Sequence, residues 1–374
     1  MRVLIGLVLA AFCVTADAFA ADPFVVGVVS PLSGPVATVG SRQTAAIQWW
    51  ADDVNAKGGI RGRKVELVIC DDQGNPEIAV TCVRNDLARG VALLLNTSVS
   101  GAIRATLPLV KDGPVMIVAS PIIEPDPKTF VFQTSPTDFE ITKGLLAYLR
   151  ANHVNRLAMI ASTDATGEVG AANAQKVFPA GGVQLSLARI DLRANDASIQ
   201  LANVLKDNPP LLYSDYSGGG AATVVKSFSN LGLTMPLVIS NANLTEAFIA
   251  LIRNDMPRRL LGLGLNSMVP EYVTDPQEKA RIQSFNTSFE ATRKEPIDLL
   301  TYLGLMLADS ADAVLRNVDD IKNPAAVKTF LESTPIKSVS TIRFSPESHV
   351  GLGAESVAVV EYKGGHWTKA DPLQ

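Results

Sequence analysis

The chain has 374 residues, of which 47% are hydrophobic and 19% are charged, and its formal net charge is −4. A chain of this length can bury a large core, and a prior of about 150 residues per domain suggests two domains. The slightly acidic balance provides no basic surface, so neither nucleic acid nor an anionic membrane surface is an expected partner.

The N-terminus has the pattern of a secretion signal. A positive charge precedes an apolar run at 3–14, and Ala18-Phe19-Ala20 has the small residues that signal peptidase requires around its cut. We therefore expect residues 1–20 to be removed after Ala20, so that the mature chain starts at Ala21. No membrane anchor is expected, because a membrane span needs about 20 apolar residues. Cys13 lies inside the apolar run, where a lipoprotein signal would not place its cysteine.

Removal of the signal leaves Cys70 and Cys82 in a compartment that permits disulfides. Cys70 ends a predicted strand, and Cys82 lies about two turns into the helix that follows. A strand end and the next helix are neighbours in an α/β layer, so the sequence predicts a disulfide between these cysteines. The alternative is a pair of buried free thiols. No metal site is expected.

Short runs rich in β-branched residues recur along the chain and predict strands. Segments with helical apolar spacing separate them, as in the stretch 45–54. Continuous apolar strands that alternate with amphipathic helices indicate an α/β fold with parallel sheets covered on both faces. The predicted strands are Phe24–Ser30, Val65–Cys70, Ala92–Leu95, Val115–Val118, Leu157–Ala161, Val183–Leu187, Leu211–Ser214, Leu237–Ser240 and Leu260–Gly264.

The stretch 134–138 lacks a strand or helix pattern and marks a boundary between two lobes. We expect an N-terminal lobe at 21–136 and a C-terminal lobe at 137–265. After Gly264 the pattern shifts to helices and then to two further strands, which suggests a return to the first lobe at 266–340 and to the second at 341–374. The helices are predicted at Asp275–Arg293, Pro296–Arg316 and Asn323–Ser333, and the strands at Thr341–Phe344 and Val357–Tyr362.

Three stretches carry a family resemblance: "VVGVVSPLSGPVATVG" (25–40), "WADDVNAKGGIRGRKVEL" (50–67) and "CDDQGNPEIAV" (70–80). In this order and spacing the chain resembles the branched-chain amino acid (Leu/Ile/Val) binding proteins of ABC transporters. The resemblance implies the type I periplasmic binding fold, in which two Rossmann-like lobes joined by three crossovers close on a small ligand. It also implies a location in the periplasm and a membrane permease as partner.

The loop in the last of these stretches is expected to be structural. Asp72 and Asn75 have the side chains of turn and cap residues, and Asp71 and Asp72 are interpreted as structural acids rather than ligands or catalysts.

In a doubly wound sheet, ligands bind beyond the carboxyl ends of the strands. The predicted strand 92–95 is followed by 96–101, where hydroxyls and free N–H groups open a helix and favour an anion. The family holds a ligand carboxylate here, and its serine matches Ser100 best, with Ser98 and Gly101 beside it. The alternative is that Ser98 or Ser100 only caps the helix.

Two further loops of the first lobe supply candidate contacts. Ala119 and Ser120 follow the next predicted strand, in a loop that contacts the same carboxylate in the family. Ser33 and Val39 lie in the first strand-to-helix loop and are expected at the rim of the cleft. Val39 stands where relatives often have an aromatic residue, which would widen the pocket.

The second lobe departs from the family pattern. Thr166 stands where amino-acid binders have a tyrosine, and Asn241 stands where they have the glutamate that pairs with the ligand ammonium. An ammonium buried without a counter-charge would cost several kcal/mol. We therefore expect a carboxylate without an amine, such as an aromatic or aliphatic acid, unless Asp164 or Asp215 takes over the pairing.

Tyr213 and Tyr216 leave a predicted strand near Asp215 and are candidates to stack on a ligand ring, with core packing as an equal alternative. The glycines at 218–220 lack the continuation of a phosphate loop, so no nucleotide cofactor is expected. His153, His349 and His366 lie in no catalytic or metal-binding pattern and are interpreted as surface or turn residues. No enzyme activity is expected.

Two functions remain open at this point. The first is a transport receptor that closes around its solute and presents the closed form to a permease. The second is a ligand-sensing module of the same fold that reports to a regulator. The expected signal peptide and the lack of an effector domain favour transport.

Overall fold

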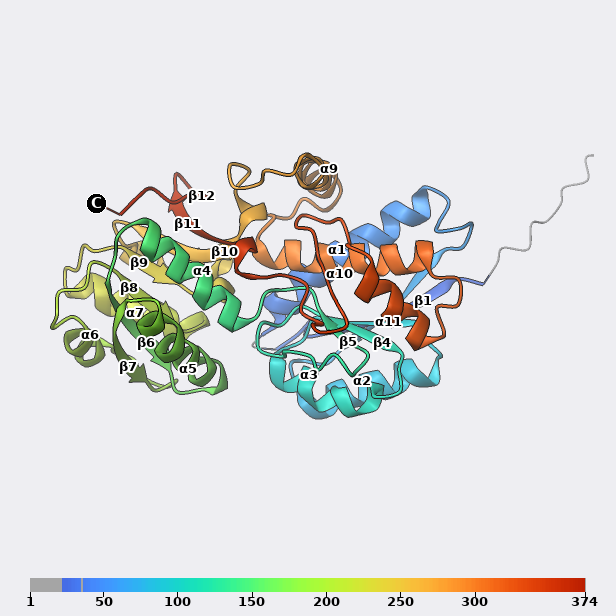
Figure 1. The fold of residues 1–374 in the computed structure, drawn as a ribbon, viewed down its shortest axis with the longest axis horizontal. Helices are drawn as coiled ribbons and strands as arrows, with labels where there is room; N and C mark the ends of the chain where they lie inside the picture. Colours follow the sequence, from blue (N-terminus) through green and yellow to red (C-terminus); the bar gives the residue numbers. More distant parts are fainter. Residues whose placement is uncertain (1–21, 35, 374) are drawn as a thin grey trace, which may run out of the picture.

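The computed structural model describes residues 22–34 and 36–373. The predicted signal peptide at 1–20, with its cut after Ala20 and with Cys13, lies outside the described residues. The chain forms two lobes side by side along the long axis of the molecule (Figure 1). The first elements, blue to cyan, build one lobe, and the green and yellow elements build the other.

The N-terminal lobe contains a parallel five-stranded sheet in the order β2-β1-β3-β4-β5. Helices cover both of its faces, so the apolar runs of β3 and β4 are fully buried. The strands are β1 (Phe24–Ser30), β2 (Val65–Asp71), β3 (Leu93–Asn96), β4 (Val115–Val118) and β5 (Val131–Gln133). The helices in this part of the chain are α1 (Ala37–Ala56), α2 (Pro76–Ala88) and α3 (Ser100–Thr106).

The C-terminal lobe contains a seven-stranded sheet in the order β12-β11-β10-β9-β8-β6-β7. β6 to β10 run parallel, and β11 and β12 add to one edge antiparallel. The strands are β6 (Arg156–Ser162), β7 (Gln184–Ile190), β8 (Leu212–Asp215), β9 (Leu237–Ile239), β10 (Leu260–Leu265), β11 (Val357–Lys363) and β12 (His366–Lys369). The helices are α4 (Asp138–Ala151), α5 (Ala165–Ala180), α6 (Ser198–Val204), α7 (Gly218–Asn230) and α8 (Glu246–Ile252).

The chain passes between the two sheets three times: after β5, after β10 and before β11. The second crossing leads to helices that return to the N-terminal lobe, where α10 packs along α1 and α11 packs on β4. These helices are α9 (Pro276–Arg293), α10 (Leu299–Asn317) and α11 (Pro324–Ser333). The predicted α/β fold with two mostly parallel sheets is confirmed.

Three strand predictions were wrong in detail. β5 and β12 were missed, because one is three residues long and the other lacks an apolar run. The predicted strand Thr341–Phe344 joins neither sheet, and Ile342 makes only an isolated bridge to Ile336. Ile342 and Phe344 are nevertheless buried in the N-terminal lobe. Their alternating apolar pattern therefore reflects a loop with one buried face.

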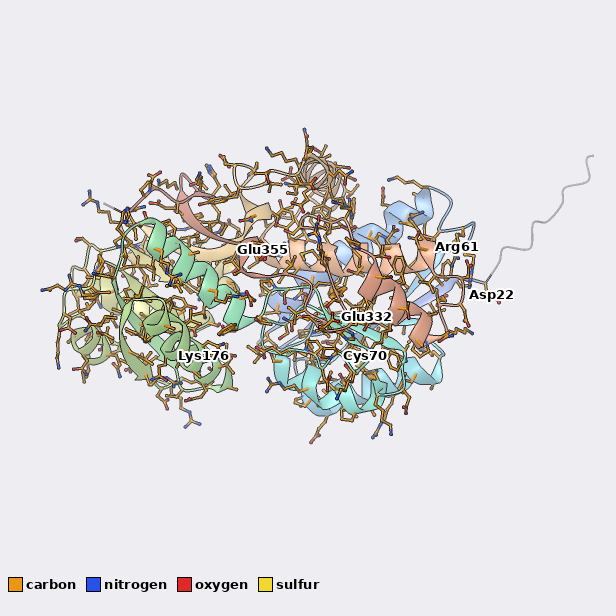
Figure 2. The ribbon with its side chains drawn as sticks, in the orientation of Figure 1. Asp22, Arg61, Cys70, Lys176, Glu332 and Glu355 are labelled. Carbon is orange, nitrogen blue, oxygen red and sulfur yellow. A yellow bond between two sulfur atoms is a disulfide. The ribbon has the colours of Figure 1, made fainter. Side chains whose placement is uncertain are left out.

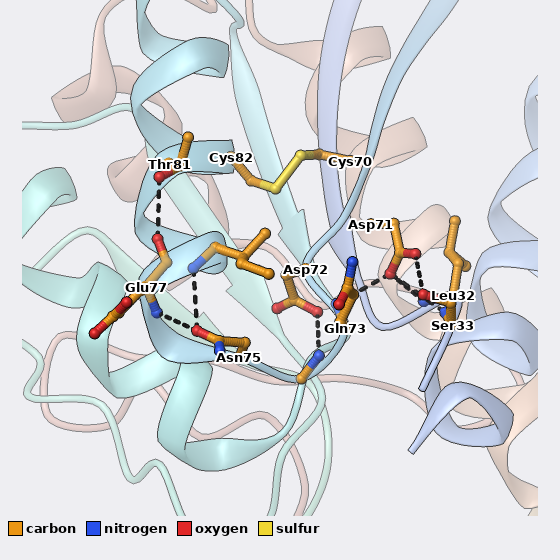
Figure 3. The surroundings of a disulfide bond; sticks show 12 residues. Leu32, Ser33, Cys70, Asp71, Asp72, Gln73, Asn75, Glu77, Thr81 and Cys82 are labelled. Carbon is orange, nitrogen blue, oxygen red and sulfur yellow. Dashed lines mark hydrogen bonds between the residues drawn. A yellow bond between two sulfur atoms is a disulfide. The ribbon is translucent and has the colours of Figure 1, made fainter. Parts of the chain in front are cut away.

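Cys70 and Cys82 form the predicted disulfide, with their Cα atoms 5.8 Å apart (Figure 3). The bond joins the end of β2 to the second turn of α2. It therefore fixes that helix on the strand that leads into the acidic loop.

The acidic loop is structural, as predicted (Figure 3). The Asp71 carboxylate accepts hydrogen bonds from Leu32 N at 2.8 Å and from the Ser33 hydroxyl at 2.6 Å. Asp72 is buried, and its carboxylate accepts a hydrogen bond from Gly74 N at 2.9 Å. Asn75 caps α2 by accepting from two N–H groups of the first helical turn. The hydrogen bonds of these side chains therefore all stay within this region of the lobe.

Replacing Cys70 and Cys82 together by serine is expected to lower the free energy of unfolding by about 3 kcal/mol, because the bridge closes a short loop and restricts the unfolded chain. The sequence separation is 12 residues. Urea unfolding followed by circular dichroism measures the difference. Reductant should destabilise the wild-type protein by a similar amount and leave the double variant unchanged. Equal unfolding free energies for the two proteins would show that the bridge contributes nothing.

Candidate functional site

The residues that the sequence predicts to hold a carboxylate lie where β3 and β4 end. The hydroxyls of Ser100 and Ser120 lie 2.6 Å apart and share one hydrogen bond. Ser100 is the first residue of α3, and Val99 occupies the N-cap position without a side-chain cap. Neither Ser98 nor Ser100 therefore caps the helix. The structure brings two hydroxyls from neighbouring loops together at an uncapped helix start.

The neighbours of this serine pair differ in what they expose. Ser98 is buried, and its hydroxyl faces the Asp72 carboxyl, whose pKa is raised by burial and lowered in part by that hydroxyl. Gly101 is exposed, with open space where a side chain would extend. Ala119 is buried beside Ser120. Ser98 and Ala119 are therefore enclosed by the lobe, and Gly101 lies beside open space.

The loop after β1 is held by Asp71. Ser33 is exposed, but its hydroxyl and its N–H both donate to the Asp71 carboxylate. Burial acts to raise the pKa of Asp71, and the hydrogen bonds from Ser33, Leu32 and Gln73 outweigh it and lower that pKa. Val39 is half-buried in the first turn of α1. Ser33 thus lies in the first strand-to-helix connection, which the acid holds, and Val39 lies in the helix that follows.

In the second lobe, Thr166 is exposed in the first turn of α5. Asp164 caps the same helix, since its carboxylate accepts from Gly167 N at 2.9 Å and from the Ser162 hydroxyl at 2.7 Å. Asn241 is half-buried and starts a single helical turn, η2 (Asn241–Asn243), directly after β9. Asp164 is thus occupied by its own helix.

A small cavity of about 20 Å³ lies where the two lobes meet. It has room for about one water molecule. Its walls are mostly apolar and come from both lobes, with Pro121, Leu299 and Leu303 on one side and Ile141, Asn241 and Leu265 on the other. Pro121 is the neighbour of Ser120, so the structure brings Asn241 close to the loop that carries Ser120.

The structure places the Tyr213 and Tyr216 side chains in the core of the second lobe. Tyr213 is 3% exposed, and its hydroxyl donates to Asp215 Oδ1 at 3.1 Å. The Tyr216 ring lies against Gly220 at the start of α7, and its hydroxyl donates to the Asp191 carbonyl at 3.3 Å. This is the core-packing alternative, because residues of α4 and α5 pack around Tyr213 and residues of α7 pack around Tyr216.

Asp215 points under α5 rather than toward the other lobe. Its Oδ2 occupies the space that a side chain at Gly170 would need and has no hydrogen-bond partner in the described chain. Burial raises the pKa of Asp215 to about 8, with the nearby Asp138 adding to the increase. Burial also raises the pKa of Asp138, whose carboxylate accepts from the Asn173 amide at 2.8 Å. Asp215 is therefore a protonated buried acid at neutral pH.

This buried acid predicts a pH dependence of stability. The folded-state pKa of Asp215 lies above the ordinary value of 3.8, so the folded protein holds an extra proton between these values. The free energy of unfolding therefore falls as the pH rises from about 4 to about 8, by at most about 1.4 kcal/mol per pH unit. The variant Asp215→Asn should show a flatter profile in urea unfolding over this range. The exposed Asp207→Asn is the matched control, and an identical slope in all three proteins would contradict the assignment.

The sequence interpretation of His349 as a surface or turn residue was wrong, because the side chain is fully buried. His153 and His366 are exposed, as expected. No spacing pattern marked His349, since its partners lie far away in the sequence. A cavity of about 610 Å³ was also not predicted. It lies between α1, α10 and α11, where Arg281 pairs with Asp309 and Arg316 pairs with Asp312.

Within residues 22–34 and 36–373, no three or more His, Cys, Asp or Glu side chains are grouped so that they could hold a metal ion. In the same part of the chain, each helix is too short or too polar to cross a membrane.

The fold and the convergence of loops from two lobes define a two-lobed ligand-binding protein. A family model described as periplasmic binding protein matches residues 23–366, and the chain belongs to this family. The family resemblance seen in the sequence is thereby confirmed, and the matched proteins are binding proteins rather than enzymes by name.

Three matched proteins illustrate the relationship. The Leu/Ile/Val-binding protein BraC3 of Rhizobium johnstonii is 30% identical over 164 residues, covering 42% of this chain and 44% of that protein, so the match spans less than half of the relative. The Leu/Ile/Val/Thr-binding protein of Salmonella typhimurium is 23% identical over 332 residues, covering 85% and 86%. A solved ABC transporter substrate-binding protein from Sphaerobacter thermophilus has a TM-score of 0.79 at 20% identity, covering 94% of this chain and 98% of that chain.

Proposed function

We propose that this chain is the extracytoplasmic solute-binding component of an ABC uptake system and that its lobes close on a small carboxylate. The family assignment supports a solute-binding role. Relatives named for binding Leu, Ile and Val, and a similar fold named as an ABC transporter substrate-binding protein, support the transport context and a membrane permease as partner. The expected signal peptide supports a periplasmic location.

The serine pair supports a carboxylate as the ligand's charged end. Ser100 and Ser120 carry hydroxyls that can each turn from one another toward an incoming anion. A carboxylate oxygen accepts two or more hydrogen bonds, so it can replace the single hydrogen bond that the two hydroxyls now share. Gly101 leaves the approach to Ser100 open. The ligand contacts of Ser98, Ala119, Ser33 and Val39 remain predictions around this centre.

The observation that carries the proposal is that both candidate acids of the second lobe already have structural roles within that lobe. Asp164 caps α5, and Asp215 is buried beneath the same helix. Asn241, which stands where the family has the glutamate that pairs with the ligand ammonium, is uncharged, and so is Thr166, which stands where the family has a tyrosine. An ammonium enclosed between the lobes would thus lack a counter-charge from these positions, at a cost of several kcal/mol. A carboxylic acid without an amine avoids this cost.

The walls around Asn241 support an apolar body for that acid. Pro121, Leu265, Leu299 and Leu303 line the cavity where the lobes meet. Closure of the lobes on an aliphatic or aromatic group would remove further apolar surface from water, at about 25 cal/mol per Å².

A thermal-shift screen tests the ligand class. The panel pairs each amino acid with the acid that has the same body and no amine, such as leucine with isocaproate and phenylalanine with phenylpropionate. A ligand at a hundred times its Kd adds about 2.7 kcal/mol to the free energy of unfolding, so binding raises Tm clearly. We expect the amine-free acids to stabilise the protein and their amino acids not to. Stabilisation by leucine alone would overturn the ligand class.

An uptake assay tests the role of the protein. Deleting the gene should abolish uptake of the acid found in the screen, and restoring the gene should recover it. Intact uptake combined with loss of a transcriptional response to the acid would favour the sensing alternative instead.

A further inference from the structure

Two polar side chains line the small cavity where the lobes meet. Ser135 of the first crossover is 3% exposed, and its hydroxyl is enclosed without a hydrogen-bond partner in the described chain. Asn241 is half-buried at the start of η2, and its side-chain amide makes no hydrogen bond within residues 22–34 and 36–373. The other described residues around the cavity are apolar or glycine. An apolar wall therefore carries two polar groups that the chain itself does not use.

Asn241 is not required to hold its own turn. Asn243, two residues later, donates from its amide to the Tyr216 carbonyl at 2.6 Å and to the Ser240 hydroxyl at 3.2 Å. Its Oδ1 accepts from Gly218 N at 2.9 Å. These hydrogen bonds fix η2 and with it the position of Asn241, whose amide stays available.

Ser135 lies beside the loop that carries Ser120. The first crossover is held on that loop, because Asp138 N donates to the Pro121 carbonyl at 2.8 Å. The Ser135 carbonyl accepts from the Gln133 amide at 3.1 Å. The main chain of Ser135 is therefore fixed, and its hydroxyl is left to bind another group.

The cavity lies beside the crossovers. Leu265 lines it and ends β10, where the second crossover begins. The amide of the next residue, Asn266, donates to the Glu355 carbonyl of the third crossover at 2.7 Å. Figure 2 labels Glu355 between the two lobes. Residues next to a hinge are displaced little when lobes rotate about it, so Ser135 and Asn241 stay near each other as the lobes close.

An acid with a wholly apolar body would leave both polar groups without a partner once closure excludes water. Enclosed polar groups of this kind favour a ligand that carries a hydrogen-bonding atom over an analogue that lacks it. An ammonium does not suit the place, because none of the described residues that line the cavity is charged.

A neutral oxygen suits it better. Such an oxygen accepts from the Asn241 amide, and the Ser135 hydroxyl can donate to it as well. The cavity volume of about 20 Å³ has room for one oxygen of this kind.

We propose that Asn241 and Ser135 bind a hydroxyl or oxo oxygen next to the ligand's carboxylate, so that the ligand is a 2-hydroxy or 2-oxo acid with an apolar body. Carbon 2 follows from the chain order, since Pro121 lines the cavity and directly follows Ser120. The inference rests on the proposed function, because it places the oxygen relative to a carboxylate bound at Ser100 and Ser120.

Calorimetry with three acids of one carbon skeleton tests the oxygen. The probes are isocaproate, 2-oxoisocaproate and both enantiomers of 2-hydroxyisocaproate. One neutral hydrogen bond strengthens binding by about two- to tenfold, so the oxo acid and one enantiomer of the hydroxy acid should bind about tenfold more tightly than isocaproate. Equal Kd values would overturn the inference and leave the carboxylate proposal standing. If none of the acids bound, the carboxylate proposal would fail and the inference with it.

Substitutions in the cavity assign the contact. Asn241→Leu and Ser135→Ala should each lower the preference for the oxygenated acids over isocaproate by about two- to tenfold. Asn230→Leu is the matched control and should keep the preference, because Asn230 is exposed at the end of α7. A full preference in the Asn241→Leu protein would place the oxygen elsewhere and refute the assignment.

The variant Asn241→Asp separates a direct contact from a change in the shape of the site. A carboxylate accepts from a 2-hydroxyl but has no proton for a 2-oxo oxygen. The Kd of the oxo acid divided by that of the hydroxy acid should therefore rise about tenfold, although the new charge weakens binding of both. An unchanged ratio would show that Asn241 does not contact the oxygen. Circular dichroism confirms that each variant is folded before its binding is measured.

Discussion

Replacing Ser100 and Ser120 together by alanine is expected to weaken binding of the acid found in the screen by at least about a hundredfold. A hydrogen bond to a charged group contributes about 1.5–3 kcal/mol, so the loss of two removes at least about 3 kcal/mol of binding free energy. The hydroxyls lie 2.6 Å apart, which places both within reach of one carboxylate. Isothermal titration calorimetry measures the loss.

Ser217→Ala provides a matched control for this experiment. Ser217 is an exposed serine at the start of α7 in the other lobe and makes no side-chain cap. Its replacement should leave the Kd within about twofold, since its hydroxyl lies outside the proposed carboxylate site. If the double serine variant binds the acid as tightly as the wild type, the carboxylate binds at another place in the protein. Circular dichroism confirms that the variant is folded before its binding is measured.

The variant Phe285→Ala should lose about 3–5 kcal/mol of unfolding free energy, the range observed when a large buried ring is deleted and its cavity remains. Phe285 is fully buried on α9, and its ring centroid lies 4.9 Å from that of Trp49 and 5.0 Å from that of Phe289. Tyr302 on α10 completes the group at 6.1 Å. Deleting the ring therefore loosens α9 from α1 and α10 together.

Urea unfolding measures this loss, with Leu251→Ala as the control. Leu251 is 62% exposed, and surface substitutions of this kind change stability by about 0.5 kcal/mol or less. A loss below about 1 kcal/mol at Phe285 would mean that α9 repacks and that the aromatic group does not hold the returning helices on the N-terminal lobe.

Local patterns were enough to predict most of the framework. The apolar runs predicted β1 and β4 with their observed limits, because a strand buried on both faces must be continuously apolar. The cysteine positions predicted the disulfide, since a strand and its following helix are always neighbours in this architecture. The acidic loop was interpreted correctly because turn and cap chemistry depends on residues within a few positions.

Side-chain orientation beyond the strand ends was not predictable in the same way. Tyr213 and Asp215 lie in β8 and Tyr216 follows it, and a strand end alone does not show which helix will cover each side chain. In the structure Gly170 on α5 makes room for Asp215, and Gly220 on α7 makes room for Tyr216. These glycines are neighbours of the strand only after folding. The ligand contact of the tyrosine side chains was therefore a prediction that local sequence could not decide.

By itself, the sequence determined that this chain folds into two α/β lobes, that a disulfide joins a strand to a helix in the first lobe, and that a helical segment returns to that lobe. Periodicity and turn chemistry act over short distances, so local sequence is enough to predict these features. Only the tertiary structure decided that Asp164 caps α5, that Asp215 is buried beneath the same helix, and that His349 is enclosed between Val131 and Glu332. The physical reason is that burial and hydrogen-bond partners, which set the charge state of an ionisable group, come from residues distant in sequence that packing brings together.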